Sequence, residues 1–172
     1  KGSLESGRLT TKNTIAVVVR ADSSQAFDLR NYDLFTGKLV SRSSKLGNET
    51  GVKAFSADGS RFAHAHRELL GFYDGVTGKL IWSDAVAANS VGALAITSDA
   101  LIVSGNGTLE SRDPATGKVL RKFKRPLVKE DEQDRGRDDI TDSKEGKWFA
   151  QRVSDTHLAV WRTDKEDSVH LF

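Results

Sequence analysis

Short apolar runs separated by turn-forming residues recur along almost the whole chain. A typical stretch is Val52–Phe55, followed by Asp58-Gly59, by Phe62-Ala63 and then by Leu69–Tyr73. Runs of this length between Asp-Gly or Asn-Gly dipeptides are typical of β-strands joined by tight turns, whereas an amphipathic helix requires a 3.6-residue period. The pattern therefore predicts an all-β chain in which most strands are antiparallel to their neighbours in sequence.

A motif that recurs about every 40 residues organises these strands. It consists of Asp-x-x-Thr-Gly-Lys followed by two aliphatic residues, and its aspartates lie 41 and then 39 residues apart. The three copies contain Asp33, Thr36 and Gly37; Asp74, Thr77 and Gly78; and Asp113, Thr116 and Gly117. An Asp side chain can accept hydrogen bonds from backbone N–H groups two or three residues later, and Gly supplies a positive φ. Each copy therefore predicts the turn of a β-hairpin, with a structural role for its Asp, Thr and Gly.

Each repeat contains four predicted strands, so the chain is expected to form four sheets. Four antiparallel strands per 40 to 45 residues are typical of a β-propeller blade. The expected blades cover approximately residues 9–44, 50–86, 90–124 and 138–172, and a charged insertion, 124–139, separates the last two. In the first blade only Leu9-Thr10 stands out as a candidate first strand. We therefore expect residues 1–172 to form a single β-propeller domain or part of one.

One family resemblance is carried by the strands and by the residues that end each repeat. The segment 55–63 is similar to the first two strands of a WD40-type repeat, and three aromatic residues stand where that family has its repeat-ending Trp. These residues are Tyr32, Tyr73 and Trp161. The chain departs from the family pattern at Arg112, which replaces this aromatic residue in the third repeat, and it lacks the family's Gly-His dipeptide. The resemblance implies a non-enzymatic propeller that mediates protein–protein interaction or acts as an assembly scaffold.

A second resemblance is carried by the turn motif of the second repeat. Asp74-x-x-Thr77-Gly78-x-x-x-Trp82 resembles the tryptophan-docking motif of quinoprotein-like propellers, and the equivalents of Trp82 are Ser41 and Arg121. This likeness keeps open an alternative function, an enzyme of the quinoprotein-like or hydrolase-like kind with its site at the central channel. The choice between the two families stays open at this point.

The number of blades leaves three arrangements open. Propellers usually have four to eight blades, and a blade that lacks a neighbour exposes apolar surface. The chain could be a fragment of a longer propeller, a half-ring that closes by oligomerisation, for instance as a homodimer, or a self-closed ring of four. The absence of a methionine at position 1 favours an excised or processed piece. The expected partner is therefore another protein or the remainder of the same propeller.

Composition and charge exclude several classes of function. The chain has 26 basic and 24 acidic residues, and this near-balance argues against a dedicated binder of nucleic acid or of membrane surfaces. The lack of cysteine excludes disulfides, zinc–thiolate sites and thiol nucleophiles. No apolar run approaches 18 residues, and no signal peptide is visible, which favours a cytoplasmic location.

Few residues suggest catalysis or metal binding. His64 and His66 alternate on a predicted strand, so both side chains should share a face and could act as two metal ligands. No carboxylate joins them in one motif, so two ordinary strand residues are the favoured interpretation. The turn role already explains the repeated aspartates, and neither a nucleophile elbow nor a phosphate-binding loop occurs. We therefore expect neither a catalytic residue nor a cofactor.

The charged insertion is the remaining candidate site. The repeat-ending positions are 41, 39 and then 49 residues apart, which locates the extra residues between the third and fourth repeats. In a propeller such a connection lies on one rim of the ring, where partners dock. The candidate partner-contact residues are Lys124, Arg125, Lys129, Arg135 and Arg137. The alternative is a solvated loop without a binding role.

Overall fold

The computed structural model describes residues 2–10, 13–21, 27–43, 46, 51–88, 90–124, 140–143, 147–152, 158–165 and 170–171. All regular secondary structure in these residues is β-strand. The strands are β1 (Gly2–Leu9), β2 (Thr14–Ala21), β3 (Phe27–Asp33), β4 (Leu39–Ser43), β5 (Val52–Phe55), β6 (Arg61–His66), β7 (Leu69–Asp74), β8 (Leu80–Ala85), β9 (Ala93–Ile96), β10 (Leu101–Gly105), β11 (Thr108–Arg112), β12 (Val119–Lys122), β13 (Ile140–Asp142), β14 (Trp148–Arg152), β15 (Leu158–Arg162) and β16 (His170–Leu171). A helix with the length and apolarity needed to cross a membrane is not found in the described parts of the chain.

The strands form four separate sheets, each built from four strands consecutive in sequence. The orders are β1-β2-β3-β4, β5-β6-β7-β8, β9-β10-β11-β12 and β13-β14-β15-β16, and every pairing is antiparallel. We term these sheets blades 1 to 4. This arrangement confirms the predicted all-β, propeller-like architecture of four four-stranded antiparallel blades.

The first strand lies further upstream than the sequence indicated. β1 begins at Gly2 and ends at Leu9, whereas Leu9-Thr10 was the predicted position, so blade 1 begins before residue 9. The segment contains two glycines and four polar or charged residues, and it lacks the apolar alternation that identifies a half-buried strand. Its pairing with the valine-rich β2, from Gly2 opposite Ala21 to Leu9 opposite Ile15, makes it a strand.

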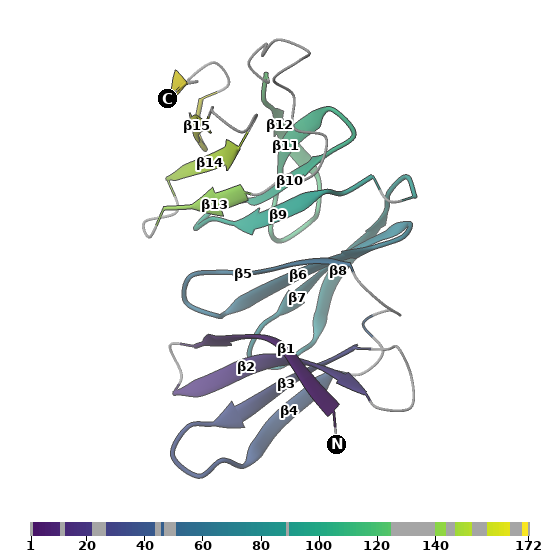
Figure 1. The fold of residues 1–172 in the computed structure, drawn as a ribbon, viewed down its shortest axis with the longest axis vertical. Helices are drawn as coiled ribbons and strands as arrows, with labels where there is room; N and C mark the ends of the chain where they lie inside the picture. The colour runs from purple at the N-terminus through teal and green to yellow at the C-terminus, as the bar shows by residue number, and fades with distance from the viewer. Residues whose placement is uncertain are drawn as a thin grey trace.

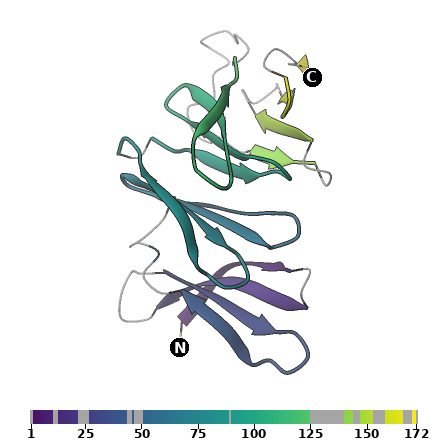
Figure 2. The same cartoon turned by 180° about the vertical axis from the view of Figure 1, so that it is seen from behind.

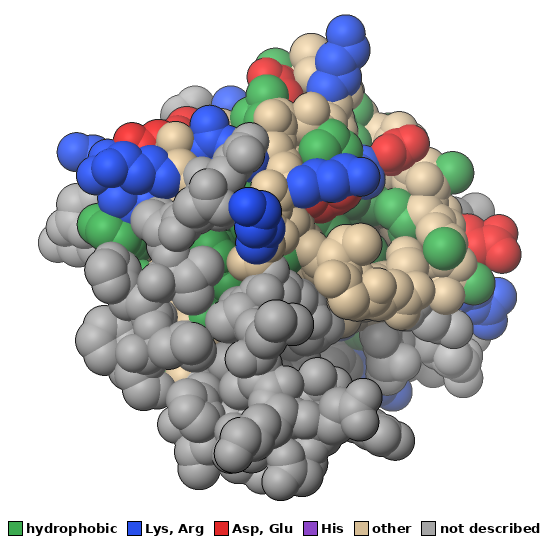
Figure 3. All heavy atoms as spheres, turned by 90° about the horizontal axis from the view of Figure 1, so that it is seen from above, with side chains coloured by type: hydrophobic (Ala, Val, Ile, Leu, Met, Phe, Trp, Pro, Cys, Tyr) green, Lys and Arg blue, Asp and Glu red, His purple; other side chains and the backbone are tan. Residues whose placement is uncertain are grey.

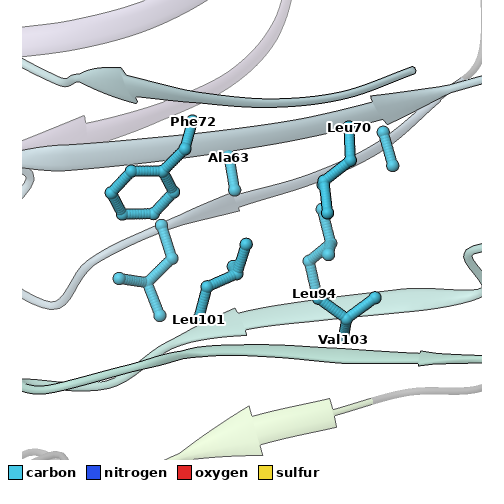
Figure 4. Packing of buried hydrophobic residues seen from close by; sticks show 8 residues of the cluster. Ala63, Leu70, Phe72, Leu94, Leu101 and Val103 are labelled. Carbon is cyan, nitrogen blue, oxygen red and sulfur yellow. The ribbon is translucent and has the colours of Figure 1, made fainter. Parts of the chain in front are cut away.

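The blades stack face to face in sequence order. We term the face that a blade turns toward its predecessor the front face, and the opposite one the back face. Back-face residues of blade 2, among them Leu70 and Phe72, pack against front-face residues of blade 3, among them Leu94 and Leu101 (Figure 4). Two further clusters join blade 1 to blade 2 and blade 3 to blade 4. We term these three interfaces joints. In each of them, apolar side chains of two consecutive blades pack against one another.

The stack is an open array rather than a closed ring. Blade 1 and the N-terminus lie at one end of its long axis, and blade 4 and the C-terminus lie at the other (Figures 1 and 2). The first strands β5, β9 and β13 contact one another in succession, so they follow one side of the stack. Blade 1 therefore does not meet blade 4, and the arrangement as a self-closed ring of four blades is wrong.

Candidate functional site

The repeated Asp-x-x-Thr-Gly motif forms the turn between the third and fourth strands of blades 1 to 3. In blade 1, Asp33 Oδ1 accepts hydrogen bonds from the Phe35 N–H at 3.0 Å, the Thr36 N–H at 2.7 Å and the Thr36 hydroxyl at 2.9 Å. The backbone and hydroxyl donors of Thr36 lower the pKa of Asp33. Asp74 and Asp113 accept the corresponding backbone bonds in blades 2 and 3. In each of the three blades the aspartate thus accepts the backbone hydrogen bonds that close the turn.

The glycine of each turn has a left-handed backbone, as predicted, with φ of 66° at Gly37, 71° at Gly78 and 75° at Gly117. Their surroundings differ. A Cβ on Gly117 would lie 2.8 Å from the indole of Trp82 in the preceding blade, whereas a Cβ on Gly37 would have no described atom within 4 Å. The turn of blade 3 is thus packed against blade 2, whereas no described residue packs against the turn of blade 1 at Gly37.

This difference gives a matched pair of variants. Gly37→Ala should cost about 1 kcal/mol of unfolding free energy, the strain of a left-handed alanine. Gly117→Ala should cost about 2 kcal/mol, because the new methyl group also displaces the Trp82 ring. Urea unfolding of the two variants at one protein concentration measures both losses. Equal losses would show that the turn of blade 3 does not depend on its contact with Trp82.

A β-bulge follows each of these turns and aims the next side chain at the following blade. In blade 2, Leu80 lies opposite Tyr73 and Trp82 lies opposite Phe72, so Ile81 has no partner in the register. Phe72 and Tyr73 are adjacent and face opposite sides of the sheet. The extra residue thus turns Trp82 to the back face, a typical effect of a bulge. Blades 1 and 3 have the same register shift at Val40 and Leu120.

The re-aimed side chain donates a hydrogen bond to the turn of the next blade at all three joints. Trp82 Nε1 donates to the Pro114 carbonyl at 3.0 Å, and its ring stacks on Phe72 with centroids 5.4 Å apart. At the equivalent positions of blades 1 and 3 the donor is the hydroxyl group of Ser41 and the guanidinium group of Arg121. Ser41 Oγ donates to the Val76 carbonyl at 2.6 Å, and Arg121 Nη1 donates to the Thr163 carbonyl at 3.1 Å. The sequence showed the complete docking motif once, but the interaction is present three times.

The position that ends each repeat also belongs to the joints. Trp161 is fully buried against blade 3, stacks on Phe149 with centroids 5.3 Å apart, and donates from Nε1 to the Lys124 carbonyl at 3.3 Å. Tyr73 is buried at the joint between blades 1 and 2. Tyr73 and Trp161 therefore pack on the preceding blade, whereas Tyr32 in blade 1 is only half-buried.

Arg112 occupies the same position in blade 3 and contributes ion pairs to its joint instead of a packed aromatic ring. Its Nη1 lies 2.6 Å from Asp84 Oδ2 on the outer strand of blade 2, and its Nε lies 2.8 Å from Glu110 Oε1. Burial by itself would lower the pKa of Arg112, but the hydrogen bonds to Asp84 and Glu110 outweigh it and raise the pKa. The departure from the aromatic pattern is thus compensated by two carboxylates.

The predicted histidine pair lies at the joint between blades 1 and 2. His64 and His66 share a face of β6, as predicted, and their rings stack with centroids 6.1 Å apart. His64 is only 3% exposed, and its Nε2 has no hydrogen-bond partner among the described residues. Lys53 lies opposite His64 in the register and places its ammonium group 4.1 Å from the Phe27 ring centroid in blade 1.

These surroundings favour an uncharged His64. Burial, followed by the charges of Lys53 and His66, lowers the pKa of His64 to about 4, while its hydrogen bond to the Leu46 carbonyl opposes this shift. A cation beside Lys53 would also be repelled. Within the described residues no group of three His, Cys, Asp or Glu side chains comes together. The histidines therefore belong to a structural joint in this arrangement.

The candidate partner-contact residues of the insertion fall mostly outside the described residues. This holds for Arg125, Lys129, Arg135 and Arg137, whose predicted role stays a prediction. Lys124 is described. Its side chain is exposed, and its backbone carbonyl accepts the hydrogen bond from Trp161, so the start of the insertion is fixed at the joint between blades 3 and 4.

A repeated apolar surface on the outermost strands was missed by the sequence analysis. The two aliphatic residues after each turn remain 38% to 57% exposed. We term them the outer aliphatic pairs; they are Leu39 and Val40, Leu80 and Ile81, and Val119 and Leu120. The signal was present, because the motif ends in two aliphatic residues in all three copies. The motif predicts only that these residues form strands, and the tertiary structure adds that no other described strand covers them.

Comparisons with known proteins do not extend this description. No model of a known protein family matches the chain, and a search of curated proteins finds no match. The resemblance to WD40-type and quinoprotein-like repeats therefore stays a prediction based on the motifs.

Proposed function

We propose that this chain is a non-enzymatic propeller-type module, of the WD40-like or quinoprotein-like kind, that binds another protein. The observation that carries the proposal is the row of outer aliphatic pairs on three successive blades. Exposed apolar residues that recur at one structural position mark an interaction surface more strongly than scattered ones do. The docking bonds between blades hold the pairs in a fixed relative arrangement.

The charged and titratable groups of the repeats support the same proposal. Asp33, Asp74 and Asp113 are engaged in turns, Arg112 joins two blades, and His64 is buried. General acid–base catalysis requires a titratable group that can reach a substrate. Groups that already complete turns and joints are poorly placed for that work, which favours a binding role over the enzymatic alternative.

Substitution of the outer pairs tests the proposal. A variant carrying Leu39→Asp, Leu80→Asp and Val119→Asp should unfold within about 1 kcal/mol of the wild type, because exposed side chains contribute little to stability. A photo-crosslinking residue at Ile81 should yield a discrete protein adduct in cells that produce the chain. The same residue at Glu68, an exposed polar position in the turn after β6, is the matched control.

The expected result is an adduct from position 81 that is lost when the three Asp substitutions are added and is absent from position 68. The absence of any adduct at position 81, or an adduct unaffected by the substitutions, would contradict a binding role for these pairs.

A further inference from the structure

A lysine comes directly before the outer aliphatic pair in each copy of the repeated motif. The three lysines are Lys38, Lys79 and Lys118, and all three side chains are exposed. We term each lysine with the two aliphatic residues after it a lysine–aliphatic unit, so that blades 1, 2 and 3 carry one unit each. A cation beside exposed apolar side chains therefore recurs at one structural position on three consecutive blades.

The backbone of the lysine is held in the same way in every unit. Its carbonyl accepts a hydrogen bond from the N–H of the turn aspartate at 2.9 Å, and its N–H donates to the hydroxyl of the turn threonine at 3.3 to 3.4 Å. The docking hydrogen bonds from Ser41 and Trp82 then tie the outer strands of blades 1 and 2 to the turn of the next blade. The three units therefore have equivalent local structures and fixed relative positions, as a surface for one partner requires.

The positive charge of these units is not neutralised within the described residues. None of the three lysines forms an ion pair with a described carboxylate. Asp84, on the outer strand of blade 2, instead pairs with Arg112 at 2.6 Å. The Thr116 N–H lowers the pKa of Asp113 most, and the charge of Lys118 contributes least to this shift. The acidic groups near the units thus have other partners, and the charge left to attract a ligand is positive.

This combination of charge and apolar surface is local. The whole chain is nearly balanced, with 26 basic and 24 acidic residues. On the described surface at the blade 4 end of the array, Asp and Glu side chains lie among the Lys and Arg side chains (Figure 3). The three units therefore do not simply reflect the overall charge of the protein.

We propose that the lysine–aliphatic units bind an acidic segment of another protein, whose carboxylates meet the lysines and whose apolar side chains cover the outer aliphatic pairs. This proposal rests on the proposed function and adds the chemistry of the partner. Complementary charges select among partners and speed their association, whereas like charges brought together at a contact are strongly unfavourable. A basic segment would meet like charge on all three blades.

Charge reversal in two units tests the proposal. Lys79→Glu with Lys118→Glu should lower the yield of the photo-crosslinked adduct from position 81 at least about ten-fold, because carboxylates of the partner would then meet carboxylates. Lys79→Arg with Lys118→Arg keeps both charges and should keep the yield within about two-fold of the unsubstituted chain. Mass spectrometry of the digested adduct should locate the crosslink in a segment with more Asp and Glu than Lys and Arg.

A second pair of substitutions is the matched control. Arg67→Glu with Lys147→Glu changes the net charge by the same amount, but these exposed residues lie in the turns before β7 and β14, outside the outer strands. The adduct yield should therefore remain unchanged. Equal urea unfolding midpoints for all variants would show that none of them loses the adduct by unfolding.

The outcomes distinguish this proposal from the proposed function. The absence of any adduct at position 81 would contradict both. An adduct that survives charge reversal, or one with a segment that is not acidic, would leave the binding role and overturn the acidic partner; the lysines would then only keep the outer strands from pairing with other chains. Sedimentation of the wild type, but not of the Lys→Glu variant, with phosphatidylserine-containing vesicles would assign the units to a membrane surface and also overturn the proposal.

Discussion

The Trp161→Ala variant is expected to lose about 4 kcal/mol of unfolding free energy, the largest effect of any single substitution considered for this chain. Trp161 has no exposed surface, stacks on Phe149 and lies in the cluster that joins blades 3 and 4. Truncation removes these contacts and leaves a cavity at the joint. It also removes the donor to the Lys124 carbonyl. Urea unfolding at a fixed protein concentration, followed by circular dichroism, measures the loss.

Two further variants separate the causes of this loss. Trp161→Phe keeps an aromatic ring but no donor, so it should cost clearly less than the alanine variant. Trp148→Ala removes the same type of side chain from the uncovered face of blade 4 and should cost about 1 kcal/mol or less, because Trp148 is substantially exposed. If Trp148→Ala and Trp161→Ala lost equal stability, burial at the joint would not be the source of the effect.

The second large effect is a loss of stability in mild acid that originates at His64. Its pKa is about 4 in the folded protein, below the 6.5 of an ordinary histidine, because burial and the charges of Lys53 and His66 oppose protonation. At a pH between these two pKa values, His64 is protonated in the unfolded chain but neutral in the folded protein. The free energy of unfolding therefore falls as the pH falls from about 6.5 to 4. The contribution is complete above pH 6.5 and its loss amounts to about 3 kcal/mol at pH 4.

The His64→Gln variant should remove this pH dependence, because glutamine cannot titrate but can still donate to the Leu46 carbonyl. Unfolding free energies measured at pH 7, 6 and 5 should therefore show the stability of the wild type falling relative to that of the variant as the pH falls. His66→Gln is the matched control on the same face of β6, and its profile should remain close to that of the wild type. Parallel profiles for wild type and His64→Gln would show that another group causes any acid sensitivity.

For the histidine pair, residue spacing predicts which face of the strand the two side chains share but not what lies against that face. Alternation along β6 correctly predicted that His64 and His66 share a face. Whether that face meets solvent, a metal or another sheet depends on Lys53, Leu46 and Phe27, which come from other segments of the chain. A buried, uncharged histidine therefore could not be distinguished from a metal ligand by sequence alone.

The docking residues show a different limit of sequence analysis. Trp82 was recognised through its motif, but Ser41 and Arg121 share no side-chain chemistry with it. What they share is a backbone position after a bulge, which points each side chain at the next turn. Arg112 is similar, since its two carboxylate partners lie on different strands and replace a packed aromatic ring with ion pairs.

The local structure of this protein follows from its amino-acid sequence, which predicts the strands, the Asp-x-x-Thr-Gly turns and the four repeats. These features depend on backbone preferences and on hydrogen bonds between residues a few positions apart, such as Asp33 with Thr36. The first strand was the exception, because Gly2–Leu9 becomes a strand only through pairing with β2. Three other properties follow from the tertiary structure: the array is open, the turn at Gly117 is packed against Trp82 whereas the turn at Gly37 has no described neighbour, and the outer aliphatic pairs stay exposed. Those properties depend on which sheet lies against which, and side chains from distant repeats decide that.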